Sequence, residues 1–365
     1  MQVSELEKVA IGLFPTPLYK LERLSSQLKS NVFIKRDDLD GVAFGGNKIR
    51  KLEYLVKEAL DLHCTTLLTY GGVQTNHGLQ TAAVACRFGL RSIIIADMMT
   101  ESPPEQLSGN LLLDAILDCE VVFLDVASIE RQNKGASAQK LQEAIREARE
   151  EATRKVIKAH EAKGERVYIS PGGGSSSLGC MGYFFAIEEI MKQLENMHQK
   201  IDYLFCAVGS AGTFSGLWLG SKYFGAPFQI MGIAVAPYSE LFNLNAATLI
   251  NETSRRFNLG INAVPEELHI FGGYEGKGYD IPDSQTFNAI YRLARTEGLF
   301  IDTVYTGKSF GGMLDFIEKE KIPSGSNVIF LHTGGAPALW TEHHEKALSR
   351  ELWSNKEHMV ISSHE

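Results

Sequence analysis

A lysine follows two glycines and an asparagine at the start of a helical pattern. Gly45 and Gly46 let the backbone approach a ligand closely, and Asn47 is a candidate helix cap. Lys48 would then lie at a helix N-terminus, where the macrodipole favours a neutral amine that can form a Schiff base with a carbonyl cofactor. Lys51, three residues later, falls on the same helical face and can meet a phosphate. The spacing fits an ordinary helix start with surface lysines as well.

A second group of polar side chains lies between a predicted strand and a predicted helix. It consists of a Gly-Gly turn followed by Gln74, Thr75, Asn76 and His77. Free backbone N–H groups, amides and a hydroxyl would form a neutral, donor-rich pocket for a carboxylate or phenolate. His77 is a candidate base, although a packed histidine with satisfied hydrogen bonds fits equally well.

Another turn between a strand and a helix contains Gly209, Ser210, Ala211, Gly212 and Thr213. Its N–H groups and hydroxyls can cradle a phosphate. The Gly-x-Gly-x-x-Gly spacing of a dinucleotide site is absent, which argues against a nicotinamide-dependent oxidoreductase. A Walker loop also fails, because the Gly-Lys-Ser at 307–309 has Asp302 in place of the first glycine. A cofactor with one phosphate therefore fits better than a nucleotide.

Short apolar runs alternate with helical patterns along the chain. The expected strands are Val32–Ile34, Thr66–Thr69, Ser92–Ala96, Glu120–Leu124, Arg166–Ile169, Tyr203–Val208, Gln229–Val235 and Asn327–Leu331. The expected helices include Asn47–Leu60, Gln74–Phe88, Gly109–Leu117, Leu178–Met197 and Ser284–Glu297. This alternation predicts βαβ units and a mostly parallel sheet, whose ligands bind at the carboxyl ends of strands. The charged segment 127–162 predicts one long solvated helix without catalytic residues.

Bulk properties exclude several classes of protein. A length of 365 residues allows two domains, and a net charge of −8 without a basic stripe argues against nucleic acid as a partner. No apolar run is long enough to span a membrane, and residues 1–14 lack the pattern of a signal peptide. The five scattered cysteines have no metal-type spacing and fit reduced thiols, so we expect a cytoplasmic protein without a metal site.

Together these segments resemble the D-cysteine desulfhydrase and 1-aminocyclopropane-1-carboxylate (ACC) deaminase family of fold type II enzymes, which depend on pyridoxal 5′-phosphate (PLP). The match runs from Phe14–Leu18 to His332–Leu339. It includes Lys35–Asp38 and Phe44–Tyr54, which look like the family's signature.

The resemblance implies an α/β, tryptophan synthase β-like fold with two open, twisted, mostly parallel α/β domains. A small domain would comprise residues 52–165. Residues 1–51 and 166–365 would form the large, discontinuous, PLP-binding domain. The resemblance also implies a homodimer.

The resemblance assigns roles at the cofactor. Lys48 matches the catalytic lysine that forms the Schiff base, and Lys51 matches a lysine near the phosphate. Asn76 matches an asparagine that contacts the oxygen on the cofactor ring. The turn of residues 209–213 looks like the phosphate loop.

The resemblance also places residues at the substrate. Tyr305 matches an active-site tyrosine, and Tyr274 matches a second one in a loop that aligns less well. The turn Gln74–Asn76 would hold the substrate carboxylate, and His77 would also lie at the substrate. Thr75, a further candidate catalytic residue, replaces the usual serine in this turn, so its extra methyl group is expected to reshape the pocket.

Two positions separate the subfamilies. ACC deaminases resemble Val-Tyr-Glu-Gly-Lys where this chain has Thr306 in the third place, and they have leucine where it has Thr333. An anionic glutamate beside the pyridine nitrogen keeps it protonated, which makes the ring the strong electron sink that opening a cyclopropane needs. A hydroxyl cannot supply that charge. Thr306 and Thr333 therefore favour β-elimination over ACC deamination.

The sequence thus predicts an enzyme that acts on a small amino acid by α,β-elimination. Lys48 or Tyr305 would remove the Cα proton. The resemblance points to D-cysteine as substrate, with pyruvate, ammonia and hydrogen sulfide as products. Alternatives are ACC deamination, elimination from another β-substituted amino acid such as cysteate, and a non-catalytic PLP-binding protein.

Overall fold

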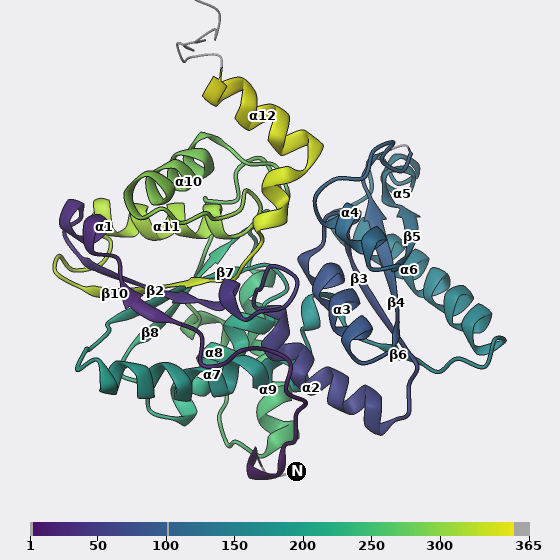
Figure 1. Ribbon diagram of the computed structural model, residues 1–365, viewed down its shortest axis with the longest axis horizontal. Coiled ribbons are helices and arrows are strands. Elements are labelled where there is room, and N and C mark those ends of the chain that lie inside the picture. The colour runs from purple at the N-terminus through teal and green to yellow at the C-terminus, as the bar shows by residue number, and fades with distance from the viewer. Residues whose placement is uncertain (1–2, 101, 354–365) are drawn as a thin grey trace, which may run out of the picture.

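The strands of the protein form two separate sheets. The computed structural model describes residues 3–100 and 102–353. One sheet has six strands and the other has four, and each lies in its own lobe (Figure 1). This mostly parallel α/β arrangement with two sheets confirms the predicted fold class.

The larger sheet has the order β1-β2-β10-β7-β8-β9. Its strands are β1 (Leu18–Lys20), β2 (Asn31–Arg36), β7 (Tyr203–Val208), β8 (Gln229–Ala234), β9 (Ile270–Phe271) and β10 (Asn327–His332). Only the β1–β2 pair is antiparallel among the strands described here. Along β10, Val328 and Phe330 face one apolar cluster, whereas Ile329 and Leu331 face another. The sheet is therefore buried on both faces, as expected for parallel strands.

Helices cover both faces of the larger sheet. One layer contains α2 (Lys48–Asp61), α7 (Ser177–Asn196), α8 (Gly212–Tyr223) and α9 (Leu241–Phe257). The other contains α1 (Glu22–Gln27), α10 (Ser284–Glu297) and α11 (Thr306–Glu318). α12 (Glu342–Trp353) follows β10 after a short 3₁₀ turn.

The smaller sheet is wholly parallel and has the order β5-β4-β3-β6. Its strands are β3 (Thr66–Gly72), β4 (Arg91–Met98), β5 (Glu120–Asp125) and β6 (Val167–Ile169). Its lobe also contains α3 (Asn76–Arg87), α4 (Gly109–Ile116), α5 (Val126–Gln132) and α6 (Ala138–Glu161) (Figure 1). The boundary of the small domain at residues 52–165 stays a prediction; the smaller sheet itself reaches Ile169.

The charged segment 127–162 does not form the single helix that its composition predicts. α5 ends at Gln132, and α6 begins after Ser137, whose hydroxyl accepts a hydrogen bond from the backbone of Lys140. Gly135 lies between them with φ +89°, a conformation that favours glycine. α6 is also not fully solvated, because Val156 packs on the smaller sheet.

All the predicted strands are present, with ends shifted by a few residues at most. β1 and β9 escaped prediction because three and two residues are too short for a recognisable pattern. None of the helices described is both long enough and apolar enough to cross a bilayer.

Candidate active site

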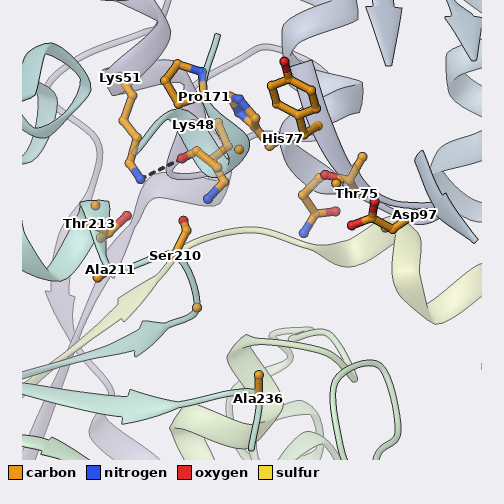
Figure 2. A pocket seen from close by; sticks show the side chains of 18 of the residues that line it. Lys48, Lys51, Thr75, His77, Asp97, Pro171, Ser210, Ala211, Thr213 and Ala236 are labelled. Carbon is orange, nitrogen blue, oxygen red and sulfur yellow. Dashed lines mark hydrogen bonds between the residues drawn. The ribbon is translucent and has the colours of Figure 1, made fainter. Parts of the chain in front are cut away.

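A cavity of about 700 Å³ lies where turns from the two sheets meet. Most of the predicted site residues line it: Lys48, Lys51, Thr75, Asn76, His77, Gly209, Ser210, Ala211, Gly212, Thr213, Tyr305 and Thr333. Figure 2 shows Lys48 between Ser210 on one wall and Thr75 on the other. Gln74, Tyr274 and Thr306 are not among the lining residues.

Lys48 is the first residue of α2, as predicted. Its backbone N–H donates to Gln80 Oε1 at 3.2 Å, and Gln80 Nε2 donates to Gly45 O at 3.0 Å, so the turn before the lysine is braced by α3. Burial and the nearby charge of Lys51 hold the pKa of Lys48 well below its usual value. Burial thus favours the neutral, nucleophilic form of this amine.

Asn47 does not act as the cap that the sequence suggests. Its side chain makes no capping hydrogen bond and instead donates to Thr213 Oγ1 at 2.8 Å. This contact joins the start of α2 to the start of α8. Asn47 therefore positions the predicted phosphate turn relative to Lys48.

A compact cradle forms around the N-terminus of α8. Gly212 N donates to Ser175 Oγ at 3.2 Å, and Ser175 donates to Ser210 Oγ at 2.7 Å. Lys51 Nζ donates to Gly173 O at 3.0 Å, and Figure 2 marks this hydrogen bond with a dashed line. A Cβ on Gly212 would lie 2.5 Å from Ser175 Oγ and 3.0 Å from Lys51 Nζ. The cradle therefore needs glycine. Burial lowers the pKa of Lys51 to about 8, and a bound dianion would raise that pKa again and keep the ammonium charged.

Thr75 caps α3, and its Oγ1 accepts from Gly78 N at 3.3 Å. Its methyl carbon lies 2.4 Å from the place that a Cβ on Gly78 would occupy, beside Ile94. The methyl group is thus accommodated by a glycine of α3. The expectation that it reshapes the cavity is not supported by this placement.

His77 lines the cavity without a strong partner. Its Nε2 lies 3.3 Å from Ser170 Oγ, and Nδ1 has no hydrogen-bond partner among the described residues. Burial, with help from the charges of Lys48 and Lys51, holds the pKa of His77 well below its usual value. The imidazole is therefore neutral.

The side chain of Gln74 faces away from the cavity. Its Nε2 donates to Ser108 O at 3.1 Å, and its Oε1 accepts from Asn110 N at 2.8 Å. Gln74 therefore ties the loop before α3 to the start of α4. The backbone of Gln74 lies in the turn predicted to bind the substrate carboxylate, whereas its side-chain amide points away from that turn's ligand side.

Two tyrosines meet at the cavity, and the sequence identified one of them. The Tyr279 hydroxyl hydrogen-bonds to the Tyr305 hydroxyl, and their ring centroids are 5.8 Å apart. Tyr274, the predicted partner, instead donates to Asp315 at 2.8 Å and accepts from Lys321 at 2.9 Å. Burial raises the pKa of Tyr305 well above its usual value, so this phenol keeps its proton.

The loop that carries Tyr279 is anchored from α11. Lys308 Nζ donates to Gly278 O at 2.7 Å and to Val235 O at 3.3 Å. No sequence pattern indicated which tyrosine of this glycine-rich loop would face the cavity. Lys308, the lysine of the Gly-Lys-Ser at 307–309, thus holds the loop that brings Tyr279 to Tyr305.

Thr306 and Thr333 differ in their surroundings. Thr306 N donates to Asp302 Oδ1 at 2.7 Å, and the Thr306 hydroxyl also bonds to Asp302. Asp302 Oδ2 accepts from the backbone of Tyr305 at 2.8 Å. Asp302 therefore holds the start of α11, and of the two threonines only Thr333 is among the residues that line the cavity.

α6 contributes to the cavity wall, which its charged composition did not indicate. Arg149 Nη2 pairs with Asp97 Oδ2 at 2.7 Å, and both residues line the cavity. Thr153 lines it as well and contacts the Tyr70 hydroxyl at 3.1 Å. Burial raises the pKa of Asp97, while Arg149 opposes the shift.

These groups fit PLP, the cofactor expected from the sequence. The glycine cradle at α8 with Lys51 suits one phosphate, and the neutral amine of Lys48 suits an aldehyde. Asn76 Nδ2, the end of the amide that does not contact Asn110, suits the anionic oxygen on the ring. Lys48, Lys51, Asn76 and the turn of residues 209–213 would hold the cofactor.

Comparisons with known proteins agree with this assignment. The family model of the pyridoxal-phosphate dependent enzymes matches residues 9–334. A Thermotoga maritima protein named "Putative 1-aminocyclopropane-1-carboxylate deaminase" is 36% identical over 335 residues, which is 92% of this chain and 98% of that protein. D-cysteine desulfhydrase of Yersinia enterocolitica is 36% identical over 330 residues, 90% of this chain and 93% of the relative.

A solved structure described as an ACC deaminase homologue covers 96% of this chain and 98% of its own, with 31% identity and a TM-score of 0.80. The family match, the two relatives and this neighbour extend over nearly the whole chain. The chain therefore belongs to the pyridoxal-phosphate dependent enzymes, within the group that contains ACC deaminases and D-cysteine desulfhydrases.

Proposed function

We propose that the protein is a lyase that converts D-cysteine and water to pyruvate, ammonia and hydrogen sulfide. The observation that carries the proposal is Thr333, a residue with an uncharged side chain that lines the cavity where the cofactor ring is expected. Thr306 adds no charge there, because its hydroxyl faces Asp302. A ring nitrogen beside neutral groups suffices for β-elimination, since the electrons leave with the Cβ substituent.

The α3 end of the cavity would bind the substrate carboxylate. The first N–H groups of a helix have no partner within the helix, and they favour an anion. Thr75 Oγ1 already accepts from Gly78, so its own proton is free to donate. The backbone of Asn76 and the Thr75 hydroxyl therefore form a donor pair for a carboxylate.

When bound, PLP supplies an aldehyde that joins to the amine of Lys48 or of the substrate, and a ring that withdraws electrons from Cα. Lys48, whose pKa burial holds well below its usual value, would be the base that takes the Cα proton. Tyr305 retains its proton and is the group that donates to the departing sulfur. The hydroxyl of Tyr279 orients that donor.

The test uses the full-length protein with PLP and D-cysteine, with release of sulfide and pyruvate as the readout. The wild type is expected to form both products in equal amounts and to show visible absorption from bound cofactor. Lys48→Ala should lose the products and that absorption. Lys57→Ala, at a partly exposed lysine of the same helix paired with Asp61, should retain both.

Other outcomes would select another function. A keto acid formed from ACC, with no pyruvate from D-cysteine, would replace the proposal by ACC deamination. Pyruvate formed from cysteate, with none from D-cysteine, would indicate that the leaving group is sulfite and not sulfide. Bound cofactor without turnover of these amino acids would favour a non-catalytic PLP-binding protein.

We also propose a cytoplasmic homodimer. All five cysteines are free thiols, which suits a reducing compartment. The dimer is proposed from the family resemblance. Light scattering of the purified protein at micromolar concentration distinguishes a dimer from a monomer.

A further inference from the structure

Asn110 lies in the first turn of α4 and is completely buried beside the loop that precedes α3. Its Nδ2 donates to the backbone carbonyl of Gln74 at 2.8 Å and to Asn76 Oδ1 at 2.7 Å. Neither the sequence motifs nor the residues lining the cavity include Asn110. It contacts the site through the backbone of Gln74 and the side chain of Asn76.

The chemistry of these contacts determines which end of each amide faces which neighbour. A backbone carbonyl only accepts, so the atom of Asn110 that meets Gln74 O is its amide nitrogen. The same nitrogen meets the side chain of Asn76, so the atom of Asn76 at that contact is its oxygen. Asn76 Nδ2 is consequently the end left for the cavity. The orientation of both asparagine amides therefore follows from the Gln74 carbonyl, which can only accept a hydrogen bond.

We propose that Asn110 is a positioning residue that fixes the polarity of Asn76, so that the cavity offers the cofactor's ring oxygen a donor. The proposal rests on the role of Asn76 at that oxygen. A reversed Asn76 amide would place an acceptor against an anion. Burial of Asn110 makes the constraint strong, because an amide nitrogen that loses its partners there cannot hydrogen-bond to solvent instead.

The decisive variant is Asn110→Asp, which keeps the shape but only accepts when ionised. Asn76 would then turn its Nδ2 toward the new carboxylate and present its oxygen to the cavity. Asn110→Ala removes the constraint without imposing the reversal. If Asn110 acts through polarity, PLP should bind at least tenfold more weakly to Asn110→Asp and by a smaller factor to Asn110→Ala.

The readout is the PLP dissociation constant of each holoenzyme, from equilibrium dialysis against graded PLP concentrations, together with thermal unfolding. A merely structural role predicts that the loss of PLP affinity follows the loss of thermal stability in both variants, because a void and a buried carboxylate would each act through the fold. Equal affinities for the two variants, or a larger loss with alanine, would overturn the proposal. Asn251→Ala, which removes a two-bond contact with the backbone of Ala263 away from the cavity, should lower stability and leave PLP affinity unchanged.

A double-variant cycle separates this mechanism from a direct effect of the new charge. In an Asn76→Ala background, Asn110→Asp should no longer weaken PLP binding, because the residue it acts through is gone. A persisting loss would contradict the proposal. An Asn76→Ala variant with wild-type affinity would overturn both the role of Asn76 and the proposal. The proposed lyase activity is tested separately by the products from D-cysteine.

Discussion

Replacing Gly212 by alanine tests whether the turn before α8 is the phosphate cradle. The new Cβ would lie 2.5 Å from Ser175 Oγ and 3.0 Å from both Ser175 Cα and Lys51 Nζ. The Lys51 ammonium can swing aside, but the Ser175 backbone cannot, so the two turns must separate. A dianion bound between them would lose its fit to the N-terminus of α8 and to Lys51.

The size of the effect follows from those two contacts. Hydrogen bonds to charged groups contribute about 1.5–3 kcal/mol each. Losing one of these hydrogen bonds completely, or both of them in part, weakens PLP binding by about 3 kcal/mol. This corresponds to a dissociation constant that is roughly 100-fold higher. Equilibrium dialysis of the full-length protein against PLP measures it directly.

The matched control is Gly311→Ala within α11, where a Cβ would meet no atom closer than 3.5 Å. Alanine there should leave PLP affinity unchanged and raise stability slightly, because alanine is the better helix former. A Gly212→Ala protein that unfolds at the wild-type temperature and binds PLP within threefold of wild type would refute the cradle.

Two further predictions concern a buried acid and the two tyrosines of one loop. Burial raises the pKa of Asp114 from 3.8 to about 7, so the folded protein holds a proton that the unfolded chain releases, and stability should fall as the pH rises from about 4 to above 7. Asp114→Asn should remove that dependence and stabilise the protein at pH 8 by at most about 4 kcal/mol, with no gain near pH 4. Urea unfolding of both proteins across this pH range measures the difference in their free energies of unfolding. A difference that does not change with pH would contradict the prediction. Tyr279→Phe should lower kcat by roughly 10²-fold, because it removes the hydrogen-bond partner of the proton donor Tyr305. Tyr274→Phe should lower stability and leave kcat unchanged. Steady-state assays of sulfide release measure both, and a loss of kcat with Tyr274→Phe but not with Tyr279→Phe would show that Tyr274 belongs to the site.

The lysine and the phosphate turn could be predicted because their signals are local. Lys48 follows a glycine pair at a helix start, and the turn at residues 209–213 follows an apolar strand, so each pattern implies its own geometry. Parallel pairing then brings the carboxyl ends of strands together. The match between sequence and structure at these positions reflects short-range chemistry.

The tyrosine pair could not be predicted in this way. Tyr274 and Tyr279 lie in one irregular loop, and neither periodicity nor capping says which of them turns inward. The choice depends on long-range contacts: Asp315 and Lys321 take the Tyr274 hydroxyl, and Lys308 holds the carbonyl before Tyr279. The orientation of Asn76 was hidden for the same reason, because Asn110 lies 34 residues away.

The helix α6 has a consequence for how such an enzyme can diverge. Its inner face supplies Arg149 and Thr153 to the cavity wall, whereas the groups proposed to hold the cofactor come from other elements. Random mutagenesis confined to residues 146–153 would therefore vary the charge and shape of that wall without changing the residues proposed to hold the cofactor. That makes α6 the segment of choice for engineering a new substrate preference by directed evolution.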